Sequence, residues 1–331
     1  MIGFIVRRLG LMLVLLVVLA GSVFVLQRYT PADPVRVKLG PNAPAEVVEA
    51  ERARLGYDDP VPVQFGRYLG DLATGDLGDS LRTRRPVTED IAAFLPATIE
   101  LVLGIVLVSA IGGIALALAT TGDSRRAAVL RFSMTGAAAA PAFLLVLVAL
   151  LLFYRNLGWV PNSGRTSYLD APDGPTGLLT VDSLVAGRVD VFVDALHHLV
   201  LPVLAGAIAS TVAVARVLRS GLIEVMRADH IRTARAKGLE ERRVLVRHAL
   251  RNACGPALSL AGLLVASMFA GTLVIEQLVA WPGLGAYTVR SIDATDFPAI
   301  AGVTLVLGAI VIMVNTTIEI LQSVADPRIR L

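Results

Sequence analysis

The sequence of 331 residues lacks most features of a catalytic or disulfide-stabilised protein. Its single cysteine, Cys254, excludes a disulfide framework and a multi-cysteine metal site. It contains no G-x-x-x-x-G-K-[ST] phosphate loop, no H-E-x-x-H zinc motif and no G-x-S-x-G nucleophile motif. The net charge of only +3 gives no support to nucleic-acid binding. Work driven by ATP would therefore need the nucleotide site of another chain.

Charged residues are also scarce, at 17% of the chain, whereas 55% of it is hydrophobic. Soluble domains have about 25% charged residues. The hydrophobic excess lies in six uncharged stretches, at residues 9–26, 101–122, 132–154, 195–215, 252–275 and 297–318. A helix needs about 20 apolar residues to cross a bilayer. The sequence predicts an all-α polytopic membrane protein with six transmembrane helices, and excludes a soluble one-domain enzyme, a fibrous protein and a disordered chain.

The basic residues predict the orientation of the spans, because cytoplasmic connections are enriched in lysine and arginine. Arg7 and Arg8 precede the first span, and residues 216–251 carry ten basic and four acidic side chains. Residues 28–96, by contrast, carry nine basic and eleven acidic side chains. Both termini are therefore predicted to be cytoplasmic. A secretory or twin-arginine signal is the alternative interpretation of Arg7, Arg8 and the apolar run that follows.

Ionisable residues are almost absent from the interiors of the spans, although ion-coupled transporters normally need them there. Those present lie near span ends: Glu100, His197, His198, Glu276 and Glu319. Adjacent helical residues point about 100° apart, so His197 and His198 favour an interfacial role over a shared metal site. Small residues such as Gly112-Gly113 favour close helix packing, and Pro141 and Pro202 predict kinks.

The cytoplasmic segment 216–251 predicts a helix–glycine–helix hairpin. Its first helix has an apolar side at helical spacing, formed by Leu222, Val225, Met226, Ile231 and Ala234. Gly238 suits a left-handed helix C-terminus, and Glu240 and Glu241 suit the start of a second helix. The apolar side of that helix would contain Leu239, Val244, Leu245 and Val246. Such a hairpin can transmit a push from a cytoplasmic partner, while a basic patch that binds anionic lipid is the alternative.

The two longest connections on the opposite side differ in character. In residues 28–96 the prolines at 31–34 stop the first helix, residues 45–55 predict a short surface helix ended by Gly56, and residues 75–78 predict a turn. Residues 155–196 are rich in glycine and proline and predict a loop rather than a further span.

Residues 232–239 read R-T-A-R-A-K-G-L, and residues 247–252 read R-H-A-L-R-N. Together they resemble the EAA loop of ABC-importer permeases in the version of the dipeptide/oligopeptide (DppB/OppB) family, although only the alanine and glycine of the general E-A-A-x-x-x-G pattern remain. Further matches follow in family order: Phe4, Arg7, Arg8, residues 31–34 (with Ala32 in place of glycine), 55–60, Gln64, 75–78, Ser80, 96–101, 158–161, 163–165, Glu276, 281–285, 296–298 and 326–330. Their order over nearly the whole chain makes the resemblance specific.

The resemblance implies a type I ABC importer permease in the bacterial cytoplasmic membrane, a transport subunit and not an enzyme. It implies an anchor helix and extracytoplasmic segment over residues 1–96, a permease core over 97–322 and a cytoplasmic tail over 323–331. The implied partners are a second homologous permease (DppC/OppC type), two ABC ATPases or a fused one, an extracytoplasmic binding protein and membrane lipid. ATP and Mg²⁺ would bind to the ATPases, with no cofactor, metal or nucleic acid bound by this chain. Di- and oligopeptides are the default substrates, and nickel, glutathione and haem stay open.

The resemblance also implies the residues that act. Residues 229–238 would enter a groove on an ATPase, where Arg232 and Arg235 would meet acidic residues. The residues proposed for this coupling are Asp229, Arg232, Thr233, Ala234, Arg235, Lys237, Gly238 and Leu239. A possible external gate would include Glu276, Trp281, Pro282, Gly283 and Gly285, with helix termination by Pro282 and Gly283 as the alternative. Residues 28–96 would dock the binding protein or cover the gate, and an ion-coupled transporter and a membrane scaffold remain as rival classes.

Overall fold

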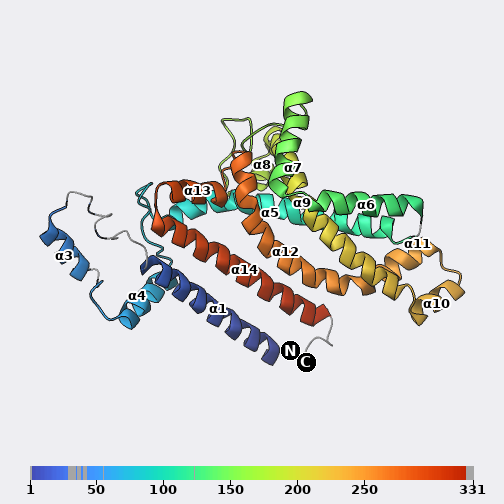
Figure 1. The fold of residues 1–331 in the computed structure, drawn as a ribbon, viewed down its shortest axis with the longest axis horizontal. Coiled ribbons are helices and arrows are strands. Elements are labelled where there is room, and N and C mark those ends of the chain that lie inside the picture. Colours follow the sequence, from blue (N-terminus) through green and yellow to red (C-terminus); the bar gives the residue numbers. More distant parts are fainter. Residues whose placement is uncertain are drawn as a thin grey trace. The chain divides into compact units, whose positions relative to one another are not determined.

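The computed structural model describes residues 2–28, 35, 39, 43–54, 56–122 and 124–325. Regular structure in these ranges is helical, apart from one isolated β-bridge between Asp79 and Pro86. The helices are α1 (Ile2–Arg28), α3 (Ala45–Arg54), α4 (Val61–Thr74), α5 (Val87–Thr120), α6 (Arg125–Ala139), α7 (Ala142–Ala149), the π-helix η1 (Leu150–Asn156), α8 (Leu179–Val185), α9 (Val189–Val225), α10 (Asp229–Ala236), α11 (Glu241–Arg243), the π-helix η2 (Val244–Ala249), α12 (Leu250–Leu278), α13 (Leu284–Asp293) and α14 (Phe297–Ala325) (Figure 1). The predictions for residues 31–34, Leu55 and residues 326–331 lie outside the described residues.

Among the residues that the structure describes, four helices are long and apolar enough to cross a membrane, namely Gly3–Arg28, Val87–Thr120, Val189–Val225 and Phe297–Ile320. Two bent pairs add two more spans if each pair is counted as one. These are Arg125–Ala139 with Ala142–Asn156, and Glu241–Leu260 with Gly262–Leu278. The all-helical, multi-pass prediction is therefore confirmed, whereas the number of six depends on the two bent pairs.

Pro141 divides the third apolar stretch into two elements. α6 ends at Ala139, and Pro141 has the extended angles φ −60° and ψ 140° before α7 begins. Proline has no N–H to donate and its ring clashes with the preceding turn of a helix. The chain consequently bends by 100° here. The predicted kink is confirmed, and it is large enough to separate α6 from α7. α9, in contrast, continues through Pro202.

The chain divides into two compact units, residues 1–95 with 287–313 and residues 96–286 with 314–331. The first unit has a small core in which Ala20 and Val23 of α1 contact Ala301 and Leu305 of α14. The ring of Phe24 on α1 also contacts the rings of Phe65 and Tyr68 on α4, with centroids 5.4 and 5.6 Å apart.

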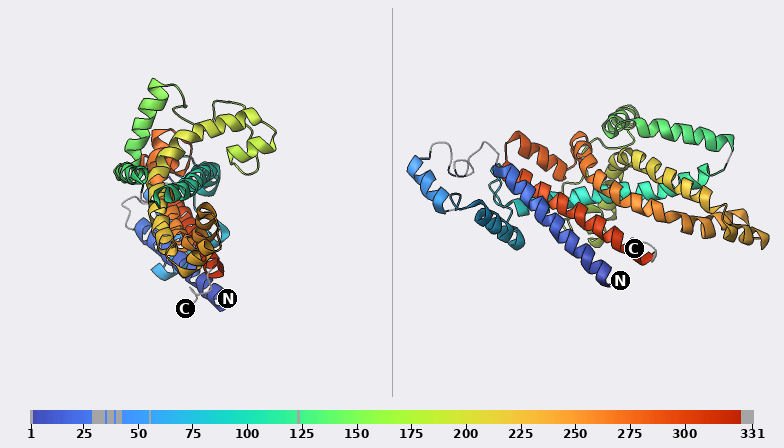
Figure 2. Two further views of the ribbon diagram at one scale, coloured as in Figure 1. Left: turned by 90° about the vertical axis from the view of Figure 1, so that its right-hand side faces the viewer. Right: turned by 60° about the horizontal axis from the view of Figure 1, so that its bottom comes forward.

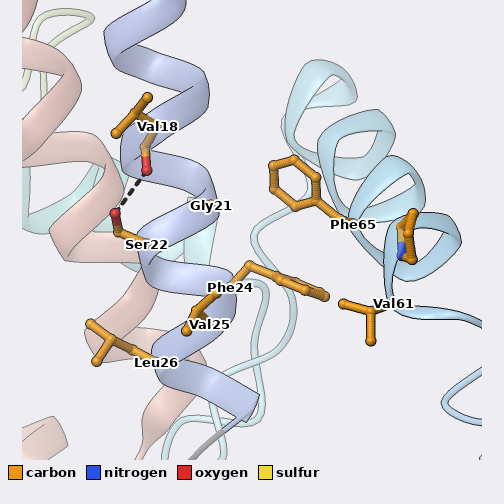
Figure 3. A pocket seen from close by; sticks show the side chains of 9 residues that line it. Val18, Gly21, Ser22, Phe24, Val25, Leu26, Val61 and Phe65 are labelled. Atoms are coloured by element: carbon orange, nitrogen blue, oxygen red, sulfur yellow. Dashed lines mark hydrogen bonds between the residues drawn. The ribbon is translucent and has the colours of Figure 1, made fainter.

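An open apolar groove of about 870 Å³ lies between α1 and α4 (Figure 3). Its wall on α1 includes Val18, Gly21 and Val25, and its wall on α4 includes Val61 and Phe65. α1 is a candidate membrane span, with only 11% of its apolar window buried. The groove therefore continues the apolar exterior of this helix.

The second unit is built on three closely packed helices, α5, α9 and α12. Glycines allow α5 and α9 to approach: a Cβ added at Gly104 would lie 2.7 Å from Val203 Cγ2, and one at Gly113 would lie 2.6 Å from Val214 Cγ1. α9 and α12 pack against each other, as Figure 1 and the right-hand view of Figure 2 show. Small residues at such contacts let helices pack through van der Waals contact where the hydrophobic effect is weak. The predicted packing role of Gly112-Gly113 is thus confirmed, since a Cβ added at Gly112 would also lie only 3.0 Å from Thr211 Cγ2.

Candidate functional site

The basic segment forms a helical hairpin at the end of α9. α9 ends at Val225, and α10 begins at Asp229 after a short turn. Gly238 has φ +76°, and α11 begins at Glu241 and leads through η2 into α12. The left-handed glycine and the second helix are confirmed. The first predicted helix is divided, because the turn at residues 226–228 separates α9 from α10.

One face of the hairpin packs into a hydrophobic cluster with α5, α9 and α12. The buried members are Ala117, Leu218, Leu222, Ile231, Ala234, Val244, Ala249, Ala253 and Ala257. Leu239 and Leu245 lie half-buried at its edge. Val246, which the sequence places on the same apolar side, is instead 47% exposed. Ala234 and Leu239 therefore hold the hairpin in shape and leave little of their surface for a partner.

The other face of the hairpin is exposed and mostly basic. It is formed by Asp229, Arg232, Thr233, Arg235, Lys237 and Gly238. Arg232 Nη1 lies 3.3 Å from Asp229 Oδ1, and Arg235 Nη2 lies 2.6 Å from Glu241 Oε1 across the Gly238 turn. The hydrogen bond with Glu241 raises the pKa of Arg235, so the guanidinium stays charged. Exposed pairs of this kind contribute little to stability, so carboxylates of a partner can replace the internal ones.

Two arginines fix the end of α5 beside the hairpin. Arg219 Nε and Arg131 Nη1 donate to the carbonyl oxygen of Thr120, at 2.8 and 3.0 Å. Arg131 Nη1 also donates to the carbonyl oxygen of Gly122 at 3.2 Å. The last carbonyls of a helix lack intrahelical partners and carry the negative end of its dipole. Arg131 and Arg219 thus cap the C-terminus of α5.

At the opposite end of α5 and α12, motifs far apart in the sequence meet in a hydrogen-bonded cluster that we call the corner. Its members come from residues 96–100, 163–165, 176–180 and 276–286. Glu276 is fully buried there and accepts from Thr98 Oγ1 at 2.7 Å. It also accepts from the backbone N–H of Gly285 at 2.7 Å and of Ala286 at 3.3 Å. The carboxylate therefore lies at the N-terminus of α13, where the helix dipole favours negative charge.

The W-P-G-L-G motif at residues 281–285 is packed tightly into the corner. Trp281 Nε1 donates to the carbonyl oxygen of Ala97 at 2.8 Å. A Cβ at Gly283 would collide with the carboxylate of Glu276, and one at Gly285 would lie 2.6 Å from Leu273 Cα. Both glycines are therefore required by close approach. Helix termination and packing account for these contacts, and a role at a gate stays a prediction.

The first unit brings two further sequence motifs together. Ser80 Oγ donates to Asp296 Oδ2 at 2.5 Å, and the backbone N–H of Arg82 donates to the same oxygen at 3.2 Å. The hydroxyls of Thr83 and Tyr287 donate to Asp90 Oδ2, at 2.6 and 3.0 Å. Ser80 and the D-F-P motif at 296–298 thus belong to one buried cluster, which sequence reasoning matched to the family but did not connect in space.

The two parts of the chain match one protein family. Residues 109–331 match the family described as "Binding-protein-dependent transport system inner membrane component", and residues 1–102 match the description of its N-terminal part. The chain therefore belongs to this family of transport subunits. It is a multi-pass protein of the inner membrane and not an enzyme.

Individual relatives confirm the resemblance to dipeptide/oligopeptide permeases. The "Probable D,D-dipeptide transport system permease protein DdpB" of Escherichia coli (strain K12) is 39% identical, over 95% of this chain and 94% of the relative. The "Di/tripeptide transport system permease protein DppB" of Pseudomonas aeruginosa (strain UCBPP-PA14) is 37% identical, over 100% and 99%. A solved structure described as "Crystal structure of an amino acid ABC transporter with histidines" has 15% identity and a TM-score of 0.46, over 73% of this chain and 94% of that one. This last likeness is too weak for a comparison of residues.

Proposed function

We propose that the chain forms, with a second homologous permease, the translocation pathway of an ATP-driven, binding-protein-dependent importer. The observation that supports this proposal is that α10 has one exposed face and one buried face. Its exposed face is basic, and Ile231 and Ala234 on its other face are buried in the hydrophobic cluster that also contains residues of α5, α9, η2 and α12. A displacement of α10 would therefore be transmitted through this cluster and not absorbed by a flexible linker.

Cytoplasmic ABC ATPases, two chains or a fused one, are the proposed source of that displacement. A groove on an ATPase would receive residues 229–238, with Arg232, Arg235 and Lys237 facing its acidic residues. ATP and Mg²⁺ would bind to the ATPases. In this proposal the hairpin and both termini lie in the cytoplasm, the corner lies on the outer side, and the chain has six spans.

Di- and oligopeptides are the proposed substrates, because the relatives above are named for dipeptide and tripeptide transport. An extracytoplasmic binding protein would deliver them to the outer side. Residues 28–96 would dock this protein or cover the gate, as their length and slightly acidic balance favour. Glu276 and residues 281–285 would then support the outer gate by fixing α13 to the end of α12.

Substitution of Gly238 tests the coupling. Its φ of +76° disfavours a β-branched residue, although no atom lies within 4 Å of an added Cβ. Gly238→Val should therefore change the turn without a steric clash and uncouple ATP hydrolysis from uptake at normal membrane levels. Gly238→Asn is the matched control, because asparagine adopts the left-handed conformation readily, and it should keep most transport. Normal uptake per ATP in the valine variant would contradict the proposal.

The rival classes predict different results in sealed vesicles that contain the assembled complex. An ion-coupled transporter would continue uptake on an ion gradient after ATP is depleted. A membrane scaffold would bind the ATPases and transport nothing. The proposed importer should stop when ATP is depleted and resume when ATP is restored, whatever the ion gradient.

A further inference from the structure

A buried ion pair in the corner joins the loop of residues 157–178 to α5. Arg165 Nη2 lies 2.7 Å from Glu100 Oε2 and also donates to the carbonyl oxygen of Gly177 at 3.1 Å. The two side chains are only 16% and 6% exposed. Glu100 Oε1 accepts from both the backbone N–H and the hydroxyl of Thr180, at 2.7 and 2.6 Å. Glu100 thus binds the start of α8 as well as the loop.

The same loop is bound to α9 and to the end of α12. Asp194 of α9 accepts from the hydroxyl of Thr166 at 2.6 Å and from the N–H of Ser167 at 2.7 Å. Leu179 of α8 packs with Val191 and Ala195 of α9. The N–H of Gly164 donates to the carbonyl oxygen of Val279 at 3.1 Å, just after α12 ends. Residues 157–185 therefore bridge the ends of the three helices whose opposite ends pack around the hairpin.

Burial makes the Arg165–Glu100 pair different from the ion pairs of the hairpin. Breaking the pair costs free energy, because loss of one partner leaves the other charge buried and unpaired. One nitrogen of the guanidinium, Nη2, makes the contacts with both Glu100 and the carbonyl oxygen of Gly177, and the guanidinium lies 6.0 Å from the ring centre of Trp281. A lysine ammonium can donate to the same two acceptors, but it lacks the planar group that lies over the indole ring. The pair is therefore suited to stay closed while the helices around it move.

We propose that Arg165 is a positioning residue for transport. Through Glu100 it holds residues 157–185 on α5, so that the loop, α8 and the corner ends of α5, α9 and α12 move as one body when α10 is displaced. This inference rests on the proposed function, since it assigns the far end of the helices that the ATPases would drive. Neither Arg165 nor Glu100 needs to contact the substrate.

A double-mutant cycle in the assembled complex tests the coupling of the pair, with uptake per ATP hydrolysed as the measurement. Arg165→Gln and Glu100→Gln should each lower this ratio about tenfold, and the double variant should be no worse than either single one. Arg165→Lys should recover part of the ratio. Arg188→Gln is the matched control, because Arg188 is only half-buried and its carboxylate partners, Asp170 and Asp190, are exposed, and it should leave the ratio unchanged. Additive losses in the double variant, or an unchanged ratio in the single ones, would overturn the proposal.

Thiol accessibility tests whether the corner stays closed while the ion pair between Arg165 and Glu100 is intact. Ala97 is fully buried, so Ala97→Cys in a Cys254→Ala background should resist a membrane-impermeant maleimide, both without nucleotide and with a non-hydrolysable ATP analogue. Adding Arg165→Gln should make the thiol reactive. Labelling of the protein with native Arg165 in either state would overturn the inference. Absence of ATP-dependent uptake in the unsubstituted complex would instead reject the proposed function.

Discussion

At the scale of single residues, glycines act in this chain through two separate physical effects. Gly238 is needed for its left-handed backbone, since an added Cβ would meet nothing. Gly283 and Gly285 are needed because a neighbour occupies the place of a Cβ. Substitutions therefore separate the two effects: the first should change coupling, and the others should change stability.

Gly285→Ala should destabilise the protein by about 1–3 kcal/mol, the usual range for overpacking. The added Cβ would lie 2.6 Å from the backbone Cα of Leu273, which has little freedom to move. The midpoint of thermal unfolding in detergent measures the effect. Gly255→Ala, in the open part of α12, has no atom within 4 Å of the new Cβ and should be neutral or slightly stabilising. Equal midpoints for the two variants would contradict this account of the corner.

At the scale of secondary-structure elements, helix ends are where separate segments of the chain are joined. α13 begins on the carboxylate of Glu276, and α5 ends on the guanidinium groups of Arg131 and Arg219. Both arrangements give hydrogen-bond partners to backbone groups that have none within their own helix. Interactions at these helix ends thus fix the start of α13 and the end of α5 to the residues that bind them.

Arg219→Gln should destabilise the second unit by about 1 kcal/mol, because the carbonyl of Thr120 would keep only its bond from Arg131. Arg216→Gln removes the same charge three residues earlier on α9, from an exposed position, and serves as the control. Denaturation in mild detergent should separate the two variants. If both lose the same stability, the loss reflects net charge and not the cap.

Deletion of residues 45–55 tests the docking role of α3. Most of α3 is exposed, so its replacement by a Gly/Ser linker should leave the membrane level of the protein unchanged. The affinity for the binding protein should fall about tenfold if α3 contributes to docking. A linker that replaces only residues 73–76, which are exposed at the end of α4, is the control and should leave this affinity unchanged. Undiminished affinity after deletion of α3 would refute docking through this helix.

At the scale of the whole molecule, the fold divides into features that the sequence predicts and features that it cannot. The hairpin is predictable in part, because Ile231 and Ala234 lie at helical spacing in α10 and Gly238 marks the turn, whereas the break at residues 226–228 is not visible in the apolar pattern. The corner is not predictable from local pattern, since Thr98 and Glu276 are 178 residues apart. Chain order and spacing contain no signal for such a contact. Only the match of both motifs to one family indicated that these residues matter, without placing them together.

The purified chain alone in liposomes should not accumulate peptide against a gradient. It has no phosphate-binding loop, and the spans have almost no ionisable residues inside them. Radiolabelled dipeptide inside the vesicles is the measurement, with the complete complex and ATP as the positive control. Accumulation by the chain alone would show that it contains its own source of energy.

The length of α9 has a consequence for where the hairpin lies. Ten residues separate Ala215, the last residue of the apolar stretch, from the end of α9 at Val225. At about 1.5 Å per residue, these ten residues extend α9 by roughly 15 Å beyond the apolar stretch. In the proposed arrangement, α10 would therefore lie past the lipid headgroups in water, where an ATPase could bind it without contacting the bilayer.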